Sequence, residues 1–267
     1  MPWARCCLRV QTGAHRRCGA ALLLIFIVGV YPRYAPLPML TAAGDTMNGF
    51  QGFSDRTEAG RALARELVAR DYPRPVVYAL PRGGVPVAFE VAEALDAPLD
   101  LLMVRKIGVP WQPELALAAV VNGDRPEVVI NEDVWRAVRV SEEAFERAKA
   151  QELETIRQRR ALYLQGRERP SAAGATAIVI DDGIATGATM RVALKALRRA
   201  SPERLILAVP VAPADTVVRL RAEVDELICL ATPTPFQAIG LHYRDFHQVS
   251  DDEVIVLLDR RQGAAAR

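Results

Sequence analysis

One segment, residues 176–200, constrains the fold of this chain more than any other. It begins with a short apolar run, Thr176–Ile180, and continues through two adjacent carboxylates, Asp181 and Asp182. A loop of small residues then leads into a predicted helix over Thr189–Ala200. A strand that is apolar on both faces is typical of a parallel sheet covered by helices. Ligands of such sheets bind at the carboxyl ends of the strands, so the two carboxylates mark a candidate site.

From Phe53 onward the chain repeats this alternation of apolar strands and helices. Further strands are expected over Val76–Leu80, Leu99–Val104, Leu115–Val121, Glu127–Ile130, Arg204–Pro210 and Glu226–Leu230. The pair over 115–130 is expected to turn at Asn122-Gly123-Asp124. Further helices are expected over 54–70, Val85–Leu95, Ser141–Gln165, Pro213–Arg221 and 250–260, the first with Ala59, Leu63, Leu67 and Val68 on one face. The pattern predicts an α/β fold with a mostly parallel sheet flanked by helices.

The first 46 residues differ from the rest of the chain. An apolar run of eleven residues, Ala20–Val30, follows several arginines and precedes three prolines. It is shorter than the about 20 residues that span a bilayer, but it has the length of a signal-peptide core. Secretion or a membrane anchor is one interpretation; the other, which we favour, is that translation begins at Met47. We therefore divide the chain into an N-terminal extension, 1–46, and one domain, 47–267.

Charge and cysteine content exclude several classes of function. Residues 1–46 carry five arginines and one acidic residue, so with a total charge of +2 the remaining 221 residues carry −2. A mildly acidic domain gives no reason to expect nucleic acid as a partner. None of the four cysteines has the spacing of a metal site, and Cys229, in an apolar run, is expected to be a buried thiol.

The residues after the strand at 176–180 suit a phosphorylated sugar. The start of a helix offers unpaired N–H groups and a partial positive charge, which favour phosphate, and Thr186 and Thr189 add hydroxyl donors. Gly187 permits close approach of the backbone. Two carboxylates beside a phosphate repel it unless something pairs with them, and a sugar diol or a divalent cation does so. A Walker A motif and a GxGxxG motif are both absent.

This segment resembles the signature of type I phosphoribosyltransferases, which bind phosphoribosyl pyrophosphate (PRPP). The resemblance implies that Asp181 and Asp182 hold the ribose hydroxyls and that the loop after them wraps the 5′-phosphate. The PRPP-binding residues implied are Asp181, Asp182, Gly183, Ile184, Ala185, Thr186, Gly187, Ala188 and Thr189. Three positions depart from the usual pattern. Gly183 replaces a larger residue, Ala188 replaces a glycine or lysine, and Ala185 replaces the aspartate of oxopurine-specific members, which disfavours hypoxanthine and guanine as acceptors.

Two further motifs resemble other parts of the same site. Arg82, Gly83 and Gly84 follow a predicted strand, as the family's pyrophosphate loop does, and their amides are expected to face the diphosphate. Arg105 and Lys106 precede Gly108 and Pro110 and resemble the start of the flexible catalytic loop. The alternative for this pair is two solvated surface cations.

The chain also resembles one poorly characterised bacterial branch of the family, and the overall resemblance covers about residues 53–258. The similarity lies in 113–116 and in 243–253, although His242-Tyr243 stands where the branch has Trp-Tyr. The second of these segments belongs to a small hood region over the site. In the hood region, Phe236, Tyr243 and Phe246 either stack on the acceptor base or pack against one another. His242 and His247 are either contacts to the base or surface residues.

The resemblance implies transfer of 5-phosphoribosyl from PRPP to a nitrogen base, with release of pyrophosphate. Lys106, Arg105, Asp181 and Asp182 are the expected catalytic residues. Mg²⁺ is the expected cofactor, bound mainly through PRPP, with Asp181 or Asp182 as its only candidate protein ligands. A PRPP-sensing regulator without turnover is the alternative. PRPP is cytosolic, so we expect a cytoplasmic protein, and the predicted helix over 141–165 either packs on the core or forms a homodimer contact.

Overall fold

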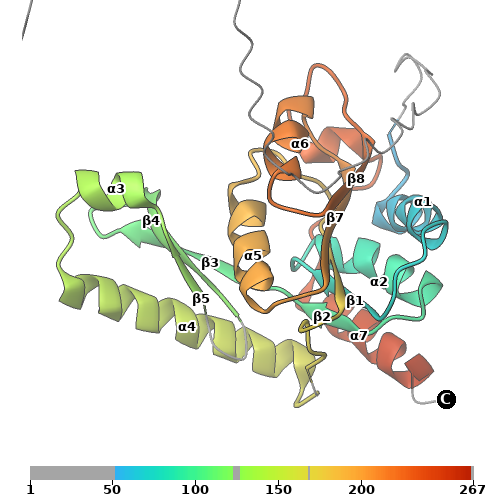
Figure 1. Ribbon diagram of the computed structural model, residues 1–267, viewed down its shortest axis with the longest axis horizontal. Coiled ribbons are helices and arrows are strands. Elements are labelled where there is room, and N and C mark those ends of the chain that lie inside the picture. The colour runs from blue at the N-terminus through green and yellow to red at the C-terminus, as the bar shows by residue number, and fades with distance from the viewer. Residues whose placement is uncertain (1–51, 123–126, 168, 266–267) are drawn as a thin grey trace, which may run out of the picture. The chain divides into compact units, whose positions relative to one another are not determined.

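The computed structural model describes residues 52–122, 127–167 and 169–265, so the extension over 1–46 lies outside it (Figure 1). Its centre is a five-stranded sheet, all parallel, in the order β2-β1-β6-β7-β8. Its strands are β1 (Pro75–Ala79), β2 (Leu99–Leu101), β6 (Thr176–Ile180), β7 (Arg204–Val211) and β8 (Glu226–Ala231). The predicted fold, a mostly parallel sheet flanked by helices, is confirmed.

The strand order places a switch point between β1 and β6. The chain leaves β1 toward β2 on one side, and it leaves β6 toward β7 and β8 on the other. Val77 lies beside Ile178 and Ala79 beside Ile180, so both strands end at the same level. Connections that diverge in this way leave a crevice at the carboxyl ends of the two strands, where open α/β sheets bind ligands.

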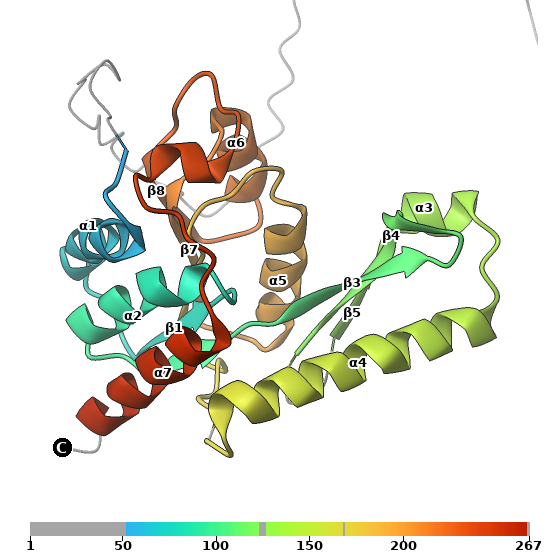
Figure 2. The ribbon, with the colours of Figure 1, turned by 180° about the vertical axis from the view of Figure 1, so that it is seen from behind.

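Helices cover both faces of this sheet. On one face lie α1 (Arg56–Val68), α2 (Gly84–Ala94) and α7 (Asp251–Ala265); on the other lie α5 (Ala188–Arg199) and α6 (Ala214–Arg221) (Figures 1 and 2). Side chains alternate accordingly: Val77 and Ile178 pack toward α1 and α2, while Tyr78 and Val179 pack toward α5. This double burial explains why the strands are apolar throughout.

A second sheet, antiparallel and three-stranded, corrects the sequence-based interpretation of residues 99–111. Its strands are β3 (Val104–Val109), β4 (Gln112–Val121) and β5 (Glu127–Ile130), in that order. The single strand expected over 99–104 is therefore two strands that belong to different sheets. The catalytic loop expected to begin at Arg105 is a strand, because Ile107 and Val109 are buried in its pairing with β4. The pairing of β4 with β5 is confirmed, and residues 123–126 of its turn lie outside the described part.

Two helices accompany this sheet (Figure 2). The short α3 (Glu132–Ala137) was not predicted; the long α4 (Glu142–Leu164) was, with Ser141 as its N-terminal cap. The sequence predicts an apolar stripe on α4, made of Ala144, Ala148, Leu153, Ile156 and Leu162. That stripe is partly wrong, because Leu162 is 46% exposed while Phe145 and Tyr163 are buried. Since α4 contacts β3, β4 and α7 of its own chain, it packs on the core. A homodimer stays a prediction.

Two smaller expectations are also corrected. The sequence leaves the cap of α1 open between Ser54 and Asp55, and the structure shows Asp55. Ala59, Leu63 and Leu67 are buried as predicted, but Val68 is 54% exposed because it points away from the face that these three residues share. Cys229 on β8 is half-buried, and burial raises the pKa of its thiol to about 11. In the described part of the chain, no helix combines the length and apolar character needed to cross a membrane.

Candidate active site

The two predicted binding motifs meet at the switch point. Asp181 and Asp182 follow β6, and the loop of Arg82, Gly83 and Gly84 follows β1 beside it. The approach leaves no room for side chains on the glycines: a Cβ on Gly84 would lie 2.9 Å from the Asp181 Cα, and one on Gly83 would lie 2.1 Å from Asp182 Oδ2. The structure therefore brings the predicted diol site and the predicted diphosphate loop into contact.

Gly83→Ala is expected to weaken PRPP binding and to cost about 1–3 kcal/mol of stability, the usual range for an overpacked site. Gly83 has φ −59° and ψ −35°, which any residue adopts, so the cost comes from the clash with Asp182 alone. Chemical denaturation and calorimetric titration with PRPP measure the two effects. Unchanged values for both would show that the two loops do not touch.

The loop after the carboxylates forms an open cradle at the start of α5. Gly187, the N-terminal cap residue, has φ +76°, a left-handed conformation that favours glycine. Ala185, Thr186, Ala188 and Thr189 are exposed, and the first turn of α5 contains no acidic residue. The Thr216 hydroxyl fixes the loop by donating to the Ala185 carbonyl over 2.9 Å. Free N–H groups at a helix start without a neighbouring acid suit an anion such as phosphate.

The structure explains the glycine at position 183. A Cβ there would lie 2.6 Å from Ile239 Cγ2 and 3.0 Å from Val211 Cγ1. Ile239, in the short 3-10 helix Ile239–His242, thus takes the space that a larger residue at position 183 needs. Ile184 is buried and its N–H donates to the Val211 carbonyl, so it supports the loop rather than facing the open cradle.

Arg56 pairs with one of the two carboxylates and was missed by the sequence analysis. It is the first residue of α1, and its Nε donates to Asp182 Oδ2 over 2.8 Å, with both side chains about nine-tenths buried. Burial raises the pKa of Asp182, and the Arg56 guanidinium opposes that rise. Burial and the neighbouring Asp182 carboxylate raise the pKa of Asp181 well above its usual range. No sequence signal pointed to this pairing, because Asp55 and Glu58 already offset a cation at the start of α1.

The aromatic residues of the hood pack against this pair. The Tyr243 hydroxyl donates to the Asp182 carbonyl over 2.5 Å, and its ring lies 5.6 Å from that of Phe53 and 5.1 Å from that of Phe246. Phe246 in turn lies under the Arg56 guanidinium. Of the two interpretations, hood packing holds for the buried Tyr243, whereas Phe246 packs in the hood and also lines the site cleft. Phe236 is half-buried beside the His242 ring, whose pKa is lowered by burial.

Arg82 lies in the same cleft. Its Nη1 contacts Asp251 Oδ1 at 3.2 Å, and Asp251 also accepts a hydrogen bond of 2.6 Å from the Tyr163 hydroxyl. The hydrogen bond from Tyr163 and the contact with Arg82 lower the pKa of Asp251. Burial, and then the hydrogen bond to Asp251, raise the pKa of Tyr163 to about 12. Arg82 is thus tied to the start of α7 while its side chain keeps 30% exposure to the cleft where the diphosphate is expected.

Arg105 and Lys106 lie on opposite faces of β3. Arg105 Nε donates to Glu152 Oε2 of α4 over 2.7 Å, whereas Lys106 is exposed and lies beside Ala119 of β4. The strand β3 begins three residues after β2 ends. The start of β3, where Arg105 and Lys106 lie, is therefore near the carboxyl edge of the main sheet. The two cations therefore have different surroundings, since Arg105 faces α4 and Lys106 lies on the other face of the strand.

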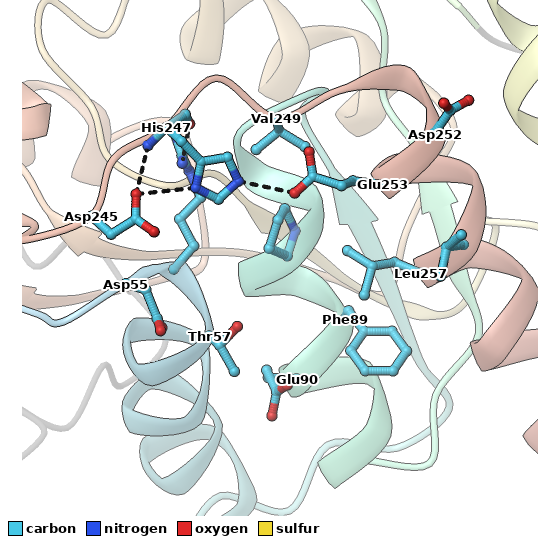
Figure 3. Close-up of a pocket in the computed structure, with 13 residues that line it drawn as sticks. Asp55, Thr57, Phe89, Glu90, Asp245, His247, Val249, Asp252, Glu253 and Leu257 are labelled. Carbon is cyan, nitrogen blue, oxygen red and sulfur yellow. Dashed lines mark hydrogen bonds and ion pairs between the residues drawn. The ribbon is translucent and has the colours of Figure 1, made fainter.

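Two cavities border the Arg56 side chain. One, of about 370 Å³, is the site cleft, lined by Arg56, Arg82, Gly83, Asp182 and residues 246–249. The other, of about 420 Å³, lies between α1, α2 and α7 (Figure 3). Arg56, His247 and Val249 line both cavities, so they form the wall between them.

His247 is held by two carboxylates (Figure 3). Its Nδ1 lies 3.1 Å from Asp245 Oδ1 and its Nε2 lies 2.9 Å from Glu253 Oε1. Hydrogen bonds with Glu253 and Asp245 raise the pKa of His247 above its ordinary value of 6.5, and bonds to Ser250 and His247 lower the pKa of Glu253 to about 2. His247 is thus a surface residue, 55% exposed, whose ring is held by two carboxylates.

The contribution of this pair to stability is expected to depend on pH. A raised folded-state pKa stabilises the protein at pH values below the unfolded-state value, and the contribution is lost as pH rises through the folded-state value. His247→Gln should therefore lower the melting temperature more at about pH 6 than at about pH 9. Thermal denaturation of both proteins at the two pH values measures this, and an equal difference at both would contradict the pairing.

The carboxylates suit a cation held chiefly by a ligand. Over the described ranges, no group of three or more His, Cys, Asp or Glu side chains is placed to hold a metal ion. Asp181 and Asp182 offer hard oxygen atoms, and Asp182 Oδ2 is already bonded to Arg56. Mg²⁺ is commonly bound through one or two carboxylates plus phosphate oxygens, so these residues fit it.

A comparison with protein families identifies the class of this chain. Residues 55–245 match the phosphoribosyl transferase domain, and the chain belongs to that family. Two strains of Mycobacterium tuberculosis have a protein, provisionally named a phosphoribosyl transferase, that is 47% identical over 208 residues. The match covers 78% of this chain and 46% of that protein, so the chain spans less than half of the relative's length.

A crystal structure of the protein TT1426 from Thermus thermophilus has the same fold. It is 40% identical, with a TM-score of 0.68, and the match covers 78% of this chain and 97% of that one. The resemblance to phosphoribosyltransferases of a bacterial branch is thereby confirmed.

Proposed function

We propose that this chain transfers 5-phosphoribosyl from PRPP to a nitrogen base and releases pyrophosphate. One observation carries the proposal: Asp181 and Asp182, the open start of α5 and the Gly83-Gly84 loop converge at one switch point. A phosphorylated sugar with a diol and a diphosphate has one group for each of these three features.

Each part of the site has a task in this reaction. The carboxylates accept hydrogen bonds from the ribose hydroxyls, and the amides of residues 185–189 bind the 5′-phosphate. The bond from C1′ to the diphosphate oxygen breaks, and a bond from C1′ to the base nitrogen forms. The base loses its proton and pyrophosphate takes the bonding electron pair. Arg82 and Lys106 are the cations proposed to face the leaving diphosphate, and the protein acts mainly by positioning and by charge.

Asp181 or Asp182 would hold Mg²⁺ together with PRPP. The cation would neutralise part of the diphosphate charge. The protein's own contribution is then to orient the sugar and to keep water from the reacting carbon. We infer that this takes place in the cytoplasm, where PRPP is found.

The acceptor is proposed to be a base other than hypoxanthine or guanine. Position 185 carries an exposed methyl group, which neither donates nor accepts the proton that an aspartate exchanges with an oxopurine. A panel of nucleobases with PRPP and Mg²⁺, scored by pyrophosphate release, tests the proposal. Release with one base supports it. PRPP binding without release for any base would favour the alternative, a PRPP-sensing regulator, and absence of PRPP binding would contradict both.

A chain that begins at Met47 is expected to fold and to bind PRPP like the full chain. Every residue assigned to the site lies between Arg56 and Asp251, within one compact unit over Thr46–Arg267. Circular dichroism and calorimetric titration with PRPP compare the two chains. Aggregation of the shorter chain, with the full chain soluble, would show that residues 1–46 belong to the native protein.

A further inference from the structure

Arg56 is a buried cation in an unusual place. It is the first residue of α1, where the helix dipole repels positive charge, and it separates the site cleft from the second cavity. Burying a guanidinium is costly unless it is paired and hydrogen-bonded. Its position is therefore stabilised by specific partners, and these partners indicate what it does.

Three contacts fix the plane of the guanidinium. Its Nε donates to Asp182 Oδ2 and its Nη1 donates to the His247 carbonyl, each over 2.8 Å. Its central carbon lies 3.9 Å from the centre of the Phe246 ring. Two bonds in the plane and one aromatic ring against its face leave the group little freedom to rotate.

Asp182 is held from several sides by this arrangement. Arg56 holds its Oδ2, the backbone of Gly83 lies against the same atom, and the Tyr243 hydroxyl holds its carbonyl. Asp182 is 7% exposed, so without Arg56 its carboxylate would lose the cation that bonds it in a buried position. Arg56 bonds Oδ2, so Oδ1 is the carboxylate oxygen that we assign to the ribose hydroxyl.

We propose that Arg56 is a positioning residue, which holds the Asp182 carboxylate in the orientation that accepts a ribose hydroxyl of PRPP. It acts through Asp182 and not on the ligand itself. The inference rests on the proposed function. It also gives a role to the hood segment 243–249, which supplies the tyrosine, the aromatic ring and the carbonyl that keep Arg56 and Asp182 in place.

A double-mutant cycle tests the inference, with PRPP affinity measured by calorimetry in the presence of Mg²⁺. Arg56→Met should weaken PRPP binding about 10–100-fold, because it leaves a buried carboxylate without its partner. In an Asp182→Asn background the same substitution should change affinity less than about threefold, because two residues that act as one unit are not additive. An equal loss in both backgrounds would overturn the inference, since Arg56 would then bind the ligand directly.

Arg56→Lys and Arg261→Met complete the set. Lysine keeps the charge but cannot bond Asp182 and the His247 carbonyl in one plane. The PRPP affinity of Arg56→Lys should therefore lie between that of wild type and that of Arg56→Met. This variant also serves if Arg56→Met does not fold. Arg261 is an equally buried guanidinium, bonded to the Ala97 carbonyl, Glu93 and Asp96, and none of these residues lines the site cleft. Arg261→Met should lower the melting temperature but leave PRPP affinity unchanged, and a loss of affinity equal to that of Arg56→Met would overturn the inference.

Failure of the proposed function gives a different result. If the wild-type chain binds no PRPP, the proposed function has failed. The crystal structure of the Arg56→Met or Arg56→Lys protein then tests whether Arg56 positions the Asp182 carboxylate. An Asp182 carboxylate that has left its place beside Gly83 supports the positioning role. A carboxylate unmoved in Arg56→Met would overturn it.

Discussion

Lys106→Ala is expected to slow turnover about 10²–10³-fold, the scale of losing one charge-stabilising donor, while PRPP affinity falls much less. Lys106 is exposed at the start of β3, near the carboxyl edge of the main sheet, on the face of the strand opposite to α4. Negative charge accumulates on pyrophosphate as the bond to C1′ breaks. A cation that interacts more strongly with that state than with bound PRPP raises turnover rather than affinity.

Arg105→Ala is the matched comparison, because this neighbour is engaged by Glu152 of α4. Its effect on turnover is expected to be much smaller than that of Lys106→Ala. Single-turnover rates with an active acceptor and PRPP affinities of both variants give the answer. Equal losses of rate and affinity in Lys106→Ala would make it a ground-state binding residue. If neither rate nor affinity falls in Lys106→Ala, Arg105 and Lys106 are solvated surface cations.

Asp182→Asn is expected to weaken PRPP binding by about 1.5–3 kcal/mol, the contribution of a hydrogen bond to a charged group. That corresponds to about 10–150-fold in the dissociation constant. The amide is nearly isosteric with the carboxylate, so the fold should persist. The structure adds a second expectation: the buried Arg56 loses its anion, so the melting temperature should fall as well.

Asp181→Asn separates these two effects. Asp181 is the other expected diol ligand, but the Arg56 Nε contact is made by Asp182. Asp181→Asn should therefore weaken PRPP binding without the same loss of stability. Calorimetry and thermal denaturation on both variants measure the difference. Unchanged PRPP affinity in Asp182→Asn would show that Asp182 does not bind PRPP.

Local patterns predicted most of the main domain. The strand Thr176–Ile180 was predicted with the observed bounds, and the expected helix over Ser141–Gln165 ends where its caps, Ser141 and Gln165, lie. Such elements are recognisable because an apolar run between polar residues, and a capping residue at a helix start, are visible in the local sequence. The site motifs at 82–84 and 181–189 were likewise visible, since glycines and carboxylates at strand ends follow from local chain geometry.

The hairpin at 104–121 was misjudged because its structure depends on a partner strand. Taken alone, Arg105 to Trp111 shows two cations, a glycine and a proline, which suggest a loop. Backbone pairing with β4 and burial of Ile107 and Val109 make it a strand instead. The exposure of Leu162 and the burial of Tyr163 on α4 depend in the same way on what lies against the helix.

The sequence by itself determined the α/β class, the order of most elements and the motifs that contact PRPP in the proposed site. These follow from periodicity and from residues close together in the chain. Only the tertiary structure decided how the carboxylates are held. Arg56 and Asp182 are 126 positions apart, and Tyr243 is a further 61 positions beyond Asp182. No local pattern links them, because their contact exists only once α1 and the hood segment have packed against the carboxyl end of β6.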